Sequence, residues 1–281
     1  MSSYLRLRQI CLATDNMPGS MADLAAIFGV RLAHEDPAVA AYGVCNAVFP
    51  FGLSFIELVA PLRADTAASR FVQLGAGRGA YMAIFNCDNP RQRRDRIRAL
   101  GLRIAAEIEL EDFHAIQLHP RDCRATMIEF DCTLGEEDLR GSYFAAGGSG
   151  WTDAIRTDVT QAISAVLIES PTPWALCEHW ATILDRPARS EAAGGTIDVD
   201  LCRIDFRRGP VEALTTVAVY VADIACVLGR AAERGFAIRS NEIVGVCGVN
   251  VSLHRAGRWA RSGRGPVPEG SGALRASTLI Q

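Results

Sequence analysis

Residues 55–62 read FIELVAPL, a stretch in which six apolar residues and a proline surround one carboxylate, Glu57. The chain repeats this arrangement in ATMIEFD, residues 125–131, where apolar residues flank Glu129. Burying a carboxylate in an aliphatic strand costs free energy unless a partner compensates it. Since side chains alternate along a strand, each glutamate is expected to share one face with the residues two positions before and after it.

The segments around these two strands predict the element order β-α-β-β-β twice within the first half of the chain. Asn89-Pro90 and Gly101 are typical of the start and end of a helix. The first unit is predicted as a strand at 5–14, a helix from Ser20 to near Gly29, and strands at 30–33, 41–49 and 54–60. The second is predicted as a strand at 81–87, a helix at 90–100, and strands at 102–108, 113–119 and 126–131.

The same order returns after a segment rich in glycine, YFAAGGSGW. The helix-to-strand junctions RALGLRI (98–104) and AERGFAI (232–238) share one layout, which indicates internal duplication. The predicted elements of this half are strands at 162–169, 196–199, 203–207, 215–221, 236–239 and 249–254, and helices at 173–184 and 223–234. The sequence therefore predicts an α+β fold with domains at 1–132 and 161–255, a linker at 133–160 and a tail at 256–281.

Composition excludes several classes of function. The net charge of −3 gives no electrostatic footprint for nucleic acid or an acidic membrane surface, and no apolar run approaches the roughly 18 residues that cross a bilayer. All 29 basic residues are arginine, so chemistry that needs a lysine, such as a Schiff base or a Walker A motif, is excluded. The chain is expected to be cytoplasmic, to bind a small molecule, and to have no nucleic-acid or membrane partner.

The paired βαβββ modules, with a glutamate on the last strand of each, resemble the vicinal oxygen chelate superfamily. This group includes glyoxalase I, methylmalonyl-CoA epimerase, extradiol dioxygenases and bleomycin resistance proteins. The layout is similar to the epimerase-like branch in RQICLATDN (8–16), FIELVAPL, YMAIFNCDNP (81–90) and LHPRDCRATMIEF (118–130). The resemblance covers residues 5–132 and, more weakly, 162–254. It implies two tandem glyoxalase-like domains, each with a cupped mixed sheet.

In this superfamily, four residues that face into one cup hold a divalent metal. Carried over position by position, they fall on Gln9, Glu57, Met82 and Glu129. The resemblance thus implies Gln9, Glu57 and Glu129 as ligands of Mg, Mn, Co, Ni or Zn, with Glu57 and Glu129 also catalytic. The thioether of Met82 does not suit a hard ion, which leaves three ligands and water.

Three further residues are expected to contact the substrate: Met82, Asn46 and His119. The position that holds the second acid–base carboxylate in the epimerase corresponds in this chain to a position near Asn46, whose amide cannot exchange protons. In the second half, the equivalent positions fall near Ala165, Phe206, Thr216 and Ser252, a set that cannot hold a metal. The second domain is therefore expected to support the first.

Two functions follow from this interpretation. The first is a metal-assisted lyase or isomerase that acts on a small carbonyl or carboxylate metabolite. The second is a metal-free binding or sequestration protein of the resistance type, built on the same scaffold. Two plainer alternatives stay open: both glutamates are solvated on an exposed strand face, and Gln9 is a hydrogen-bonded polar residue rather than a ligand. The assembly is left open between a monomer and a homodimer.

Overall fold

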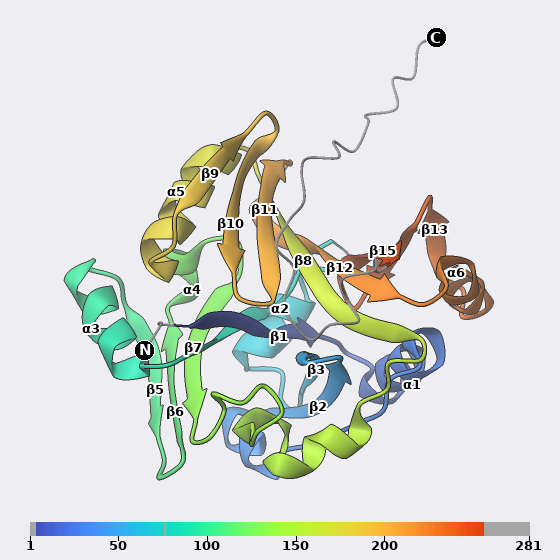
Figure 1. The fold of residues 1–281 in the computed structure, drawn as a ribbon, viewed down its shortest axis with the longest axis horizontal. Helices are drawn as coiled ribbons and strands as arrows, with labels where there is room; N and C mark the ends of the chain where they lie inside the picture. The colour runs from blue at the N-terminus through green and yellow to red at the C-terminus, as the bar shows by residue number, and fades with distance from the viewer. Residues whose placement is uncertain (1–3, 76, 256–281) are drawn as a thin grey trace.

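The computed structural model describes residues 4–75 and 77–255. This part of the chain forms two mixed β-sheets, of seven and eight strands (Figure 1). The first sheet is built from one βαββ and one βαβββ module, because the first module lacks a strand, and the second sheet is built from two βαβββ modules. The predicted α+β fold is confirmed. The tail predicted at 256–281 lies outside the described residues.

The first sheet places the two glutamate-bearing strands beside its central pair. Its strands are β1 (Leu5–Ala13), β2 (Val44–Phe51), β3 (Ser54–Pro61), β4 (Met82–Cys87), β5 (Ile104–Glu109), β6 (Phe113–Leu118) and β7 (Met127–Thr133), in the order β2-β3-β1-β4-β7-β6-β5. Strands β1 and β4 pair antiparallel at the centre. Each also pairs in parallel with the last strand of its own module, β3 or β7. The two modules are therefore related by an approximate twofold.

Side-chain caps start most of the helices around this sheet, and two strand predictions next to these helices are corrected. The helices are α1 (Met17–Phe28), α2 (Ala67–Val72), α3 (Pro90–Ala99), α4 (Pro120–Cys123) and the 3₁₀ helix η1 (Pro37–Tyr42). The strand predicted at 30–33 is wrong, because these residues join no sheet and the only pairing beside them is an isolated bridge between His34 and Val48. The next strand starts at Val44 rather than residue 41, because the Asp36 side chain caps η1.

The second sheet repeats the first with one more strand. It contains β8 (Thr160–Ser170), β9 (Ala188–Glu191), β10 (Gly194–Val199), β11 (Cys202–Arg208), β12 (Ala213–Val221), β13 (Ala237–Arg239), β14 (Glu242–Val246) and β15 (Val249–Arg255), in the order β13-β14-β15-β12-β8-β11-β10-β9. Its helices are α5 (Pro173–Leu184) and α6 (Ile224–Glu233). Strands β9 and β14 were not predicted from the sequence.

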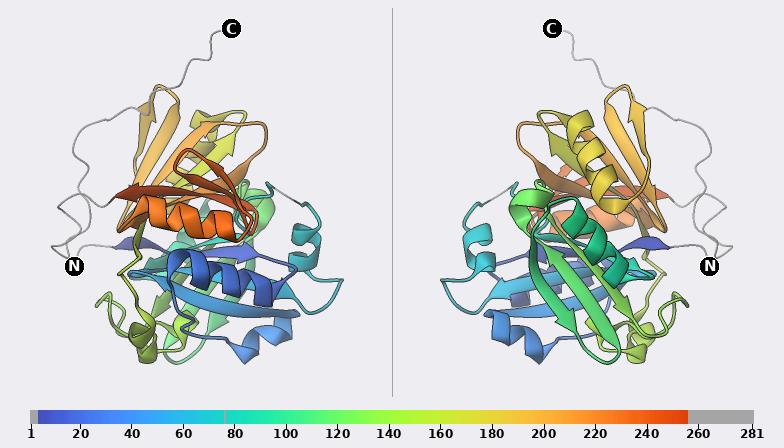
Figure 2. Two further views of the ribbon diagram at one scale, coloured as in Figure 1. Left: turned by 90° about the vertical axis from the view of Figure 1, so that its right-hand side faces the viewer. Right: turned by 90° about the vertical axis from the view of Figure 1, so that its left-hand side faces the viewer.

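The helix-covered faces of the two sheets share one apolar core. Helix α6 lies against α1, and α5 lies near α3 (Figure 2). Trp180 of α5 is fully buried there, and its Nε1 donates to the Cys123 carbonyl at 2.9 Å. Phe206 packs on the same indole with a centroid separation of 5.8 Å. Its placement among the cup positions of the second domain is therefore wrong.

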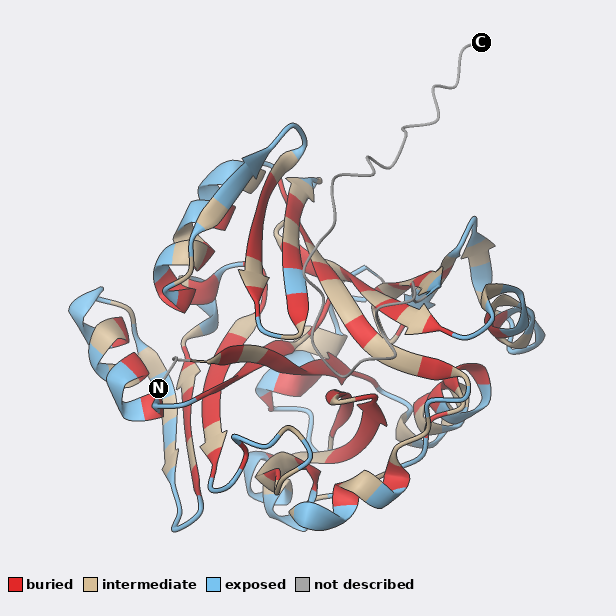
Figure 3. Ribbon diagram, in the orientation of Figure 1, coloured by how far each residue is buried: buried red, intermediate tan, exposed pale blue. Residues whose placement is uncertain are grey.

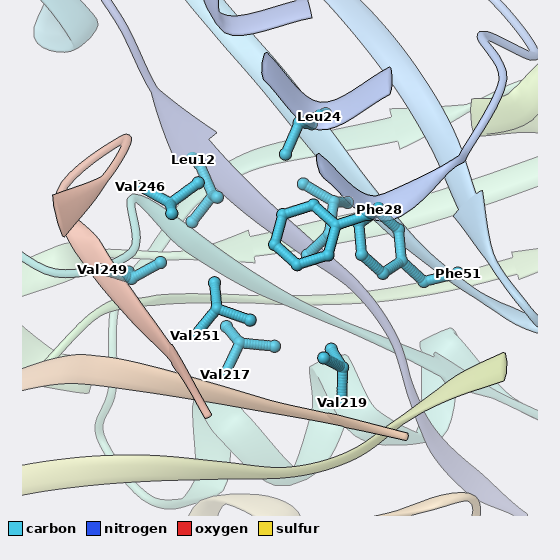
Figure 4. A pocket seen from close by; sticks show the side chains of 10 residues that line it. Leu12, Leu24, Phe28, Phe51, Val217, Val219, Val246, Val249 and Val251 are labelled. Atoms are coloured by element: carbon cyan, nitrogen blue, oxygen red, sulfur yellow. The ribbon is translucent and has the colours of Figure 1, made fainter. Parts of the chain in front are cut away.

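This shared core is densely packed. Ten apolar residues from both domains, among them Leu24, Phe28 and Val251, surround a gap of about 10 Å³ (Figure 4). A gap of this size holds one water molecule at most, so it is not a ligand site. A more polar pocket of about 400 Å³ lies at the domain boundary near Ser20 and Arg78. The Arg78 guanidinium is already engaged with the carbonyls of Ala13 and Cys247.

The opposite face of the first sheet is also covered, so its central strands are buried over most of their length (Figure 3). The segment between the sheets, 134–159, contains the short 3₁₀ helices η2 (Phe144–Ala146) and η3 (Ser149–Ala154). Tyr143 and Trp151 from this segment pack on Phe55, at centroid separations of 5.0 and 4.9 Å. This segment thus closes one end of the cup, while α2 contacts β1 and β3. Among the described residues, no helix is long and apolar enough to cross a membrane.

Candidate functional site

The face of the first sheet that points away from the shared core forms the first cup. This cup contains both glutamates that interrupt the apolar strands. Ile56 and Leu58 point into the shared core, so Glu57 between them points into the cup. Glu57 is 9 % exposed and Glu129 is 7 % exposed. The alternative that these two carboxylates are solvated on an open strand face is therefore wrong.

Two amides and a thiol hold the Glu57 carboxyl. Gln9 Nε2 donates to Glu57 Oε2 at 2.9 Å, and Asn46 Nδ2 donates to Oε1 at 2.8 Å. The Cys11 thiol also hydrogen-bonds to this carboxyl, a partner that sequence reasoning missed. The Asn46 Oδ1 accepts from the backbone N–H of Asp36 at 2.8 Å, which orients the amide with its NH₂ toward Glu57. The structure thus places Asn46 as a support for Glu57.

Glu129 has fewer partners. Gln117 Nε2 donates to Glu129 Oε2 at 2.7 Å. Burial raises the pKa of the Glu129 carboxyl to about 8, and the negative charges of Asp131 and Glu57 act in the same direction. Burial also raises the pKa of Glu57, although its hydrogen bonds oppose this shift. Both carboxyls are buried on the same face of the first sheet.

Gln117 was absent from the predicted site, although its sequence carried a signal. It lies directly opposite Glu129 in the β6–β7 pairing. The predicted strands at 113–119 and 126–131 form a hairpin, and the alternation of FHAIQL places Gln117 on its inner face. Predicting the register of this hairpin would have found it.

Strand register places Met82 at the position equivalent to Gln9. Gln9 pairs with Phe55, two residues before Glu57, while Met82 pairs with Met127, two residues before Glu129. Met82 is 7 % exposed and belongs to an apolar cluster. The buried members of that cluster are Cys11, Ala13, Val59, Met82 and Ile84, and Phe71, Val72, Tyr81 and Met127 pack against them. One side of the site is therefore polar and the other is apolar.

The candidate ligand atoms of this site are oxygens, the type of ligand that a hard divalent ion prefers. Gln9 Oε1 is buried without a hydrogen-bond partner, and two carboxyls lie in the same cup with it. Oxygen ligands of this type suit Mg²⁺ or Mn²⁺, whereas the Met82 sulfur does not. Within residues 4–75 and 77–255, no group of three or more His, Cys, Asp and Glu residues could hold a metal. An ion here would therefore depend on the amide oxygen of Gln9.

His119 occupies a structural position. It precedes α4, and its Nδ1 accepts from the backbone N–H of Arg121 at 3.3 Å. The His119 backbone N–H donates to the carbonyl of Arg103. These contacts show that His119 is the N-cap of the short helix α4.

A second buried polar cluster, which was not predicted from the sequence, lies in the same cup. Asn86 Nδ2 donates to Asp131 Oδ1 at 3.0 Å and also to the Glu136 carboxyl. The Tyr143 hydroxyl donates to Asp131 Oδ2 at 3.2 Å, and that of Tyr4 donates to Glu136 Oε1 at 3.0 Å. Burial raises the pKa of Asp131 to about 7. Tyr143 and Glu136 come from the segment after β7, so this cluster depends on how that segment folds back.

Comparison with solved structures supports the fold. The chain is similar to a hypothetical protein from Staphylococcus aureus, with 12% sequence identity and a TM-score of 0.61, over 91% of this chain and 100% of that chain.

Shorter parts of the chain are similar to methylmalonyl-CoA epimerases. The Streptomyces coelicolor enzyme, solved with 2-nitronate-propionyl-CoA, is 20% identical over 46% of this chain and 96% of its own, with a TM-score of 0.42. The Mycobacterium tuberculosis enzyme is 19% identical over 47% and 89%, with a TM-score of 0.40. No family model and no curated protein matches the sequence. The strand order of both sheets and the likeness over 91% of the chain show an α+β fold of two tandem domains, each with a mixed sheet.

Proposed function

We propose that the first cup catalyses a metal-assisted lyase or isomerase reaction on a small carbonyl or carboxylate compound. The observation that carries this proposal is the Glu129 carboxyl, which is buried in the cup and, in the metal-free protein, has its pKa raised to about 8. A carboxyl with a pKa near the working pH both accepts and returns a proton efficiently. Strongly shifted carboxyls in an enclosed polar site are typical of catalytic groups.

The residues of the cup have different roles in this reaction. Glu129, in its ionised form, takes the proton from the carbon beside the substrate carbonyl, and the electron pair of that C–H bond moves toward the carbonyl oxygen. Gln117 fixes one oxygen of Glu129 and leaves the other free for proton transfer. Glu57 is held by Gln9 and Asn46, so its charge stays at a fixed place. Glu129 then returns the proton to the substrate.

Gln9, Glu57 and Glu129 are the residues that would hold a divalent ion. Such an ion, when bound, supplies positive charge that stabilises the negative charge developing on the substrate oxygen. The buried Gln9 Oε1, which has no hydrogen-bond donor in the described structure, supports this assignment.

Solvent-deuterium exchange tests the proposal. The protein is incubated in D₂O with Mn²⁺ or Mg²⁺ and a panel of small 2-keto and 2-hydroxy acids and their thioesters. Proton NMR is expected to show loss of the signal at the carbon beside the carbonyl of at least one compound, and EDTA is expected to stop it. No exchange in any compound, with or without metal, would contradict the proposal.

Metal-free binding of an apolar ligand is the second candidate function. It is favoured by Met82, which lies in an apolar cluster where the superfamily has a metal ligand. This function predicts saturable binding of an apolar compound that EDTA leaves unchanged, with no deuterium exchange. The same NMR experiment therefore separates the two candidates.

A further inference from the structure

Arg8 is a buried cation with unused hydrogen-bonding capacity. Its side chain is 2 % exposed, and its Nη2 donates to the carbonyl of Leu139 at 2.7 Å. The Nε and Nη1 atoms are buried and have no hydrogen-bond partner in the described structure. A desolvated guanidinium normally has a carboxylate or phosphate beside it, because the lost hydration is otherwise uncompensated.

A bulge in β1 explains why Arg8 and its neighbour Gln9 both face the cup. Leu5 and Leu7 point into the shared core, and so do Ile10 and Leu12. The switch from odd to even positions occurs at the register shift between Leu7 and Gln9. Arg8 and its neighbour Gln9 therefore lie on the same side of the sheet, which simple alternation forbids.

Three aromatic rings surround the guanidinium without neutralising it. The Arg8 Cζ lies 5.4 Å from the Phe55 ring centroid, 5.3 Å from that of Tyr143 and 5.5 Å from that of Trp151. Ring faces attract a cation weakly compared with a carboxylate, and they accept no strong hydrogen bond. Tyr143 and Trp151 are each 1 % exposed, so this end of the cup is closed.

The carboxyls near Arg8 are hydrogen-bonded by other side chains. Asp131 is bonded by Asn86 and Tyr143, and Glu136 is bonded by Asn86 and Tyr4. No ion pair of the described residues includes Arg8. Two amide oxygens of this cup, Gln9 Oε1 and Asn86 Oδ1, are also buried without a donor. The cup thus contains unpaired donors and unpaired acceptors together.

We propose that Arg8 binds the carboxylate of a small acid in the first cup, an acid with a hydroxyl or carbonyl group next to its carboxylate. The carboxylate pairs with the free nitrogens of Arg8, and a hydroxyl of the same ligand donates to one of the free amide oxygens. This inference rests on the proposed function and names the class of its substrate. It places the acid between Arg8 at the closed end of the cup and the two glutamates.

Calorimetric titration with glycolate and pyruvate, in EDTA and at constant ionic strength, tests this assignment. Wild-type protein is expected to bind at least one of the two acids, and Arg8→Met to bind it roughly a hundredfold more weakly. Glycolamide, which has the size of glycolate without its charge, is not expected to compete. The control is Arg91→Met, which removes the same charge from an exposed ion pair with Glu109 and is expected to bind like wild type.

Stability measurements distinguish a ligand-binding Arg8 from a structural one. Because no carboxylate of the described residues lies within ion-pair distance of Arg8, Arg8→Met without added acid is expected to melt no lower than wild type. Should Arg8→Met fail to fold, the inference is contradicted, since Arg8 would then be structural. Arg8→Lys, which keeps the charge with a different reach, is expected to fold and to bind with intermediate affinity. Equal binding by wild type and either Arg8 variant, or no binding of either acid by wild type, would also overturn the assignment.

The inference and the proposed function can fail separately. Glu129→Gln is expected to bind the acid as wild type does but not to exchange its protons. Binding that depends on Arg8, without any deuterium exchange in wild type, would leave the Arg8 assignment standing and remove the catalytic proposal. Exchange by Arg8→Met with an unchanged KM would remove the Arg8 assignment alone.

Discussion

Glu129→Gln is expected to lower the rate of solvent-deuterium exchange by about 10²- to 10⁴-fold. Glutamine has nearly the same shape as glutamate, so it keeps the packing of a side chain that is 7 % exposed. Its amide cannot accept a proton from carbon at neutral pH, so the transfer step is lost. The rate is measured by proton NMR under the conditions that give exchange in wild type.

Glu109→Gln is the matched control for this variant. Glu109 also lies on a strand of the first sheet, but it is exposed and paired with Arg91. Its removal is expected to leave the exchange rate unchanged. A rate for Glu129→Gln close to that of wild type would show that another group moves the proton.

The metal-free protein is expected to lose stability as the pH rises from about 5 to 8. The folded state raises the pKa of Glu129 to about 8 from the usual glutamate value of 4.5, and it also raises the pKa of Glu57. Between these values, the folded protein holds a proton that the unfolded chain releases. The stabilisation is therefore complete below the unfolded pKa and is lost as the pH passes through the folded pKa. Each such carboxyl contributes a slope of roughly 1.4 kcal/mol per pH unit at most.

Urea denaturation in EDTA at several pH values measures this slope. Glu129→Gln is expected to have a flatter dependence than wild type, because its amide does not titrate. Since Glu57 and Asp131 also have raised pKa values, some slope is expected to persist in the variant. Parallel curves for wild type and Glu129→Gln would show that the Glu129 carboxyl is ionised in the folded protein across this range.

The fold was predictable because its signals are local and repeated. Periodic apolar residues, helix caps and matching helix-to-strand junctions occur in both halves of the chain. Glu57 and Glu129 were predictable for the same reason, since a lone carboxylate between apolar neighbours is conspicuous. Strand β9, with the polar sequence ARSE, lacks an apolar pattern and was missed. Helix α2 was missed because it is short and is started by the Thr66 cap rather than by a clear amphipathic repeat.

The rest of the site depends on tertiary contacts. A one-residue bulge in β1 puts Arg8 and Gln9 on the same face of the sheet, whereas strict alternation along LRLRQICLA puts these two neighbours on opposite faces. Tyr143 and Trp151 lie in a stretch that looks like a linker by its glycine content, yet both are buried against Phe55. Their role follows from packing between segments distant in sequence, which composition does not encode.

Calorimetric titration of chelator-treated protein with Mn²⁺ tests the central claim most directly. The account predicts one weak site in wild type, and no site in a variant that carries both Glu57→Gln and Glu129→Gln. Met82→His adds an imidazole at the position equivalent to Gln9 and is expected to tighten binding by about tenfold or more. Binding by the double glutamine variant as tight as that of wild type would contradict the account, and so would the absence of binding by both wild type and Met82→His.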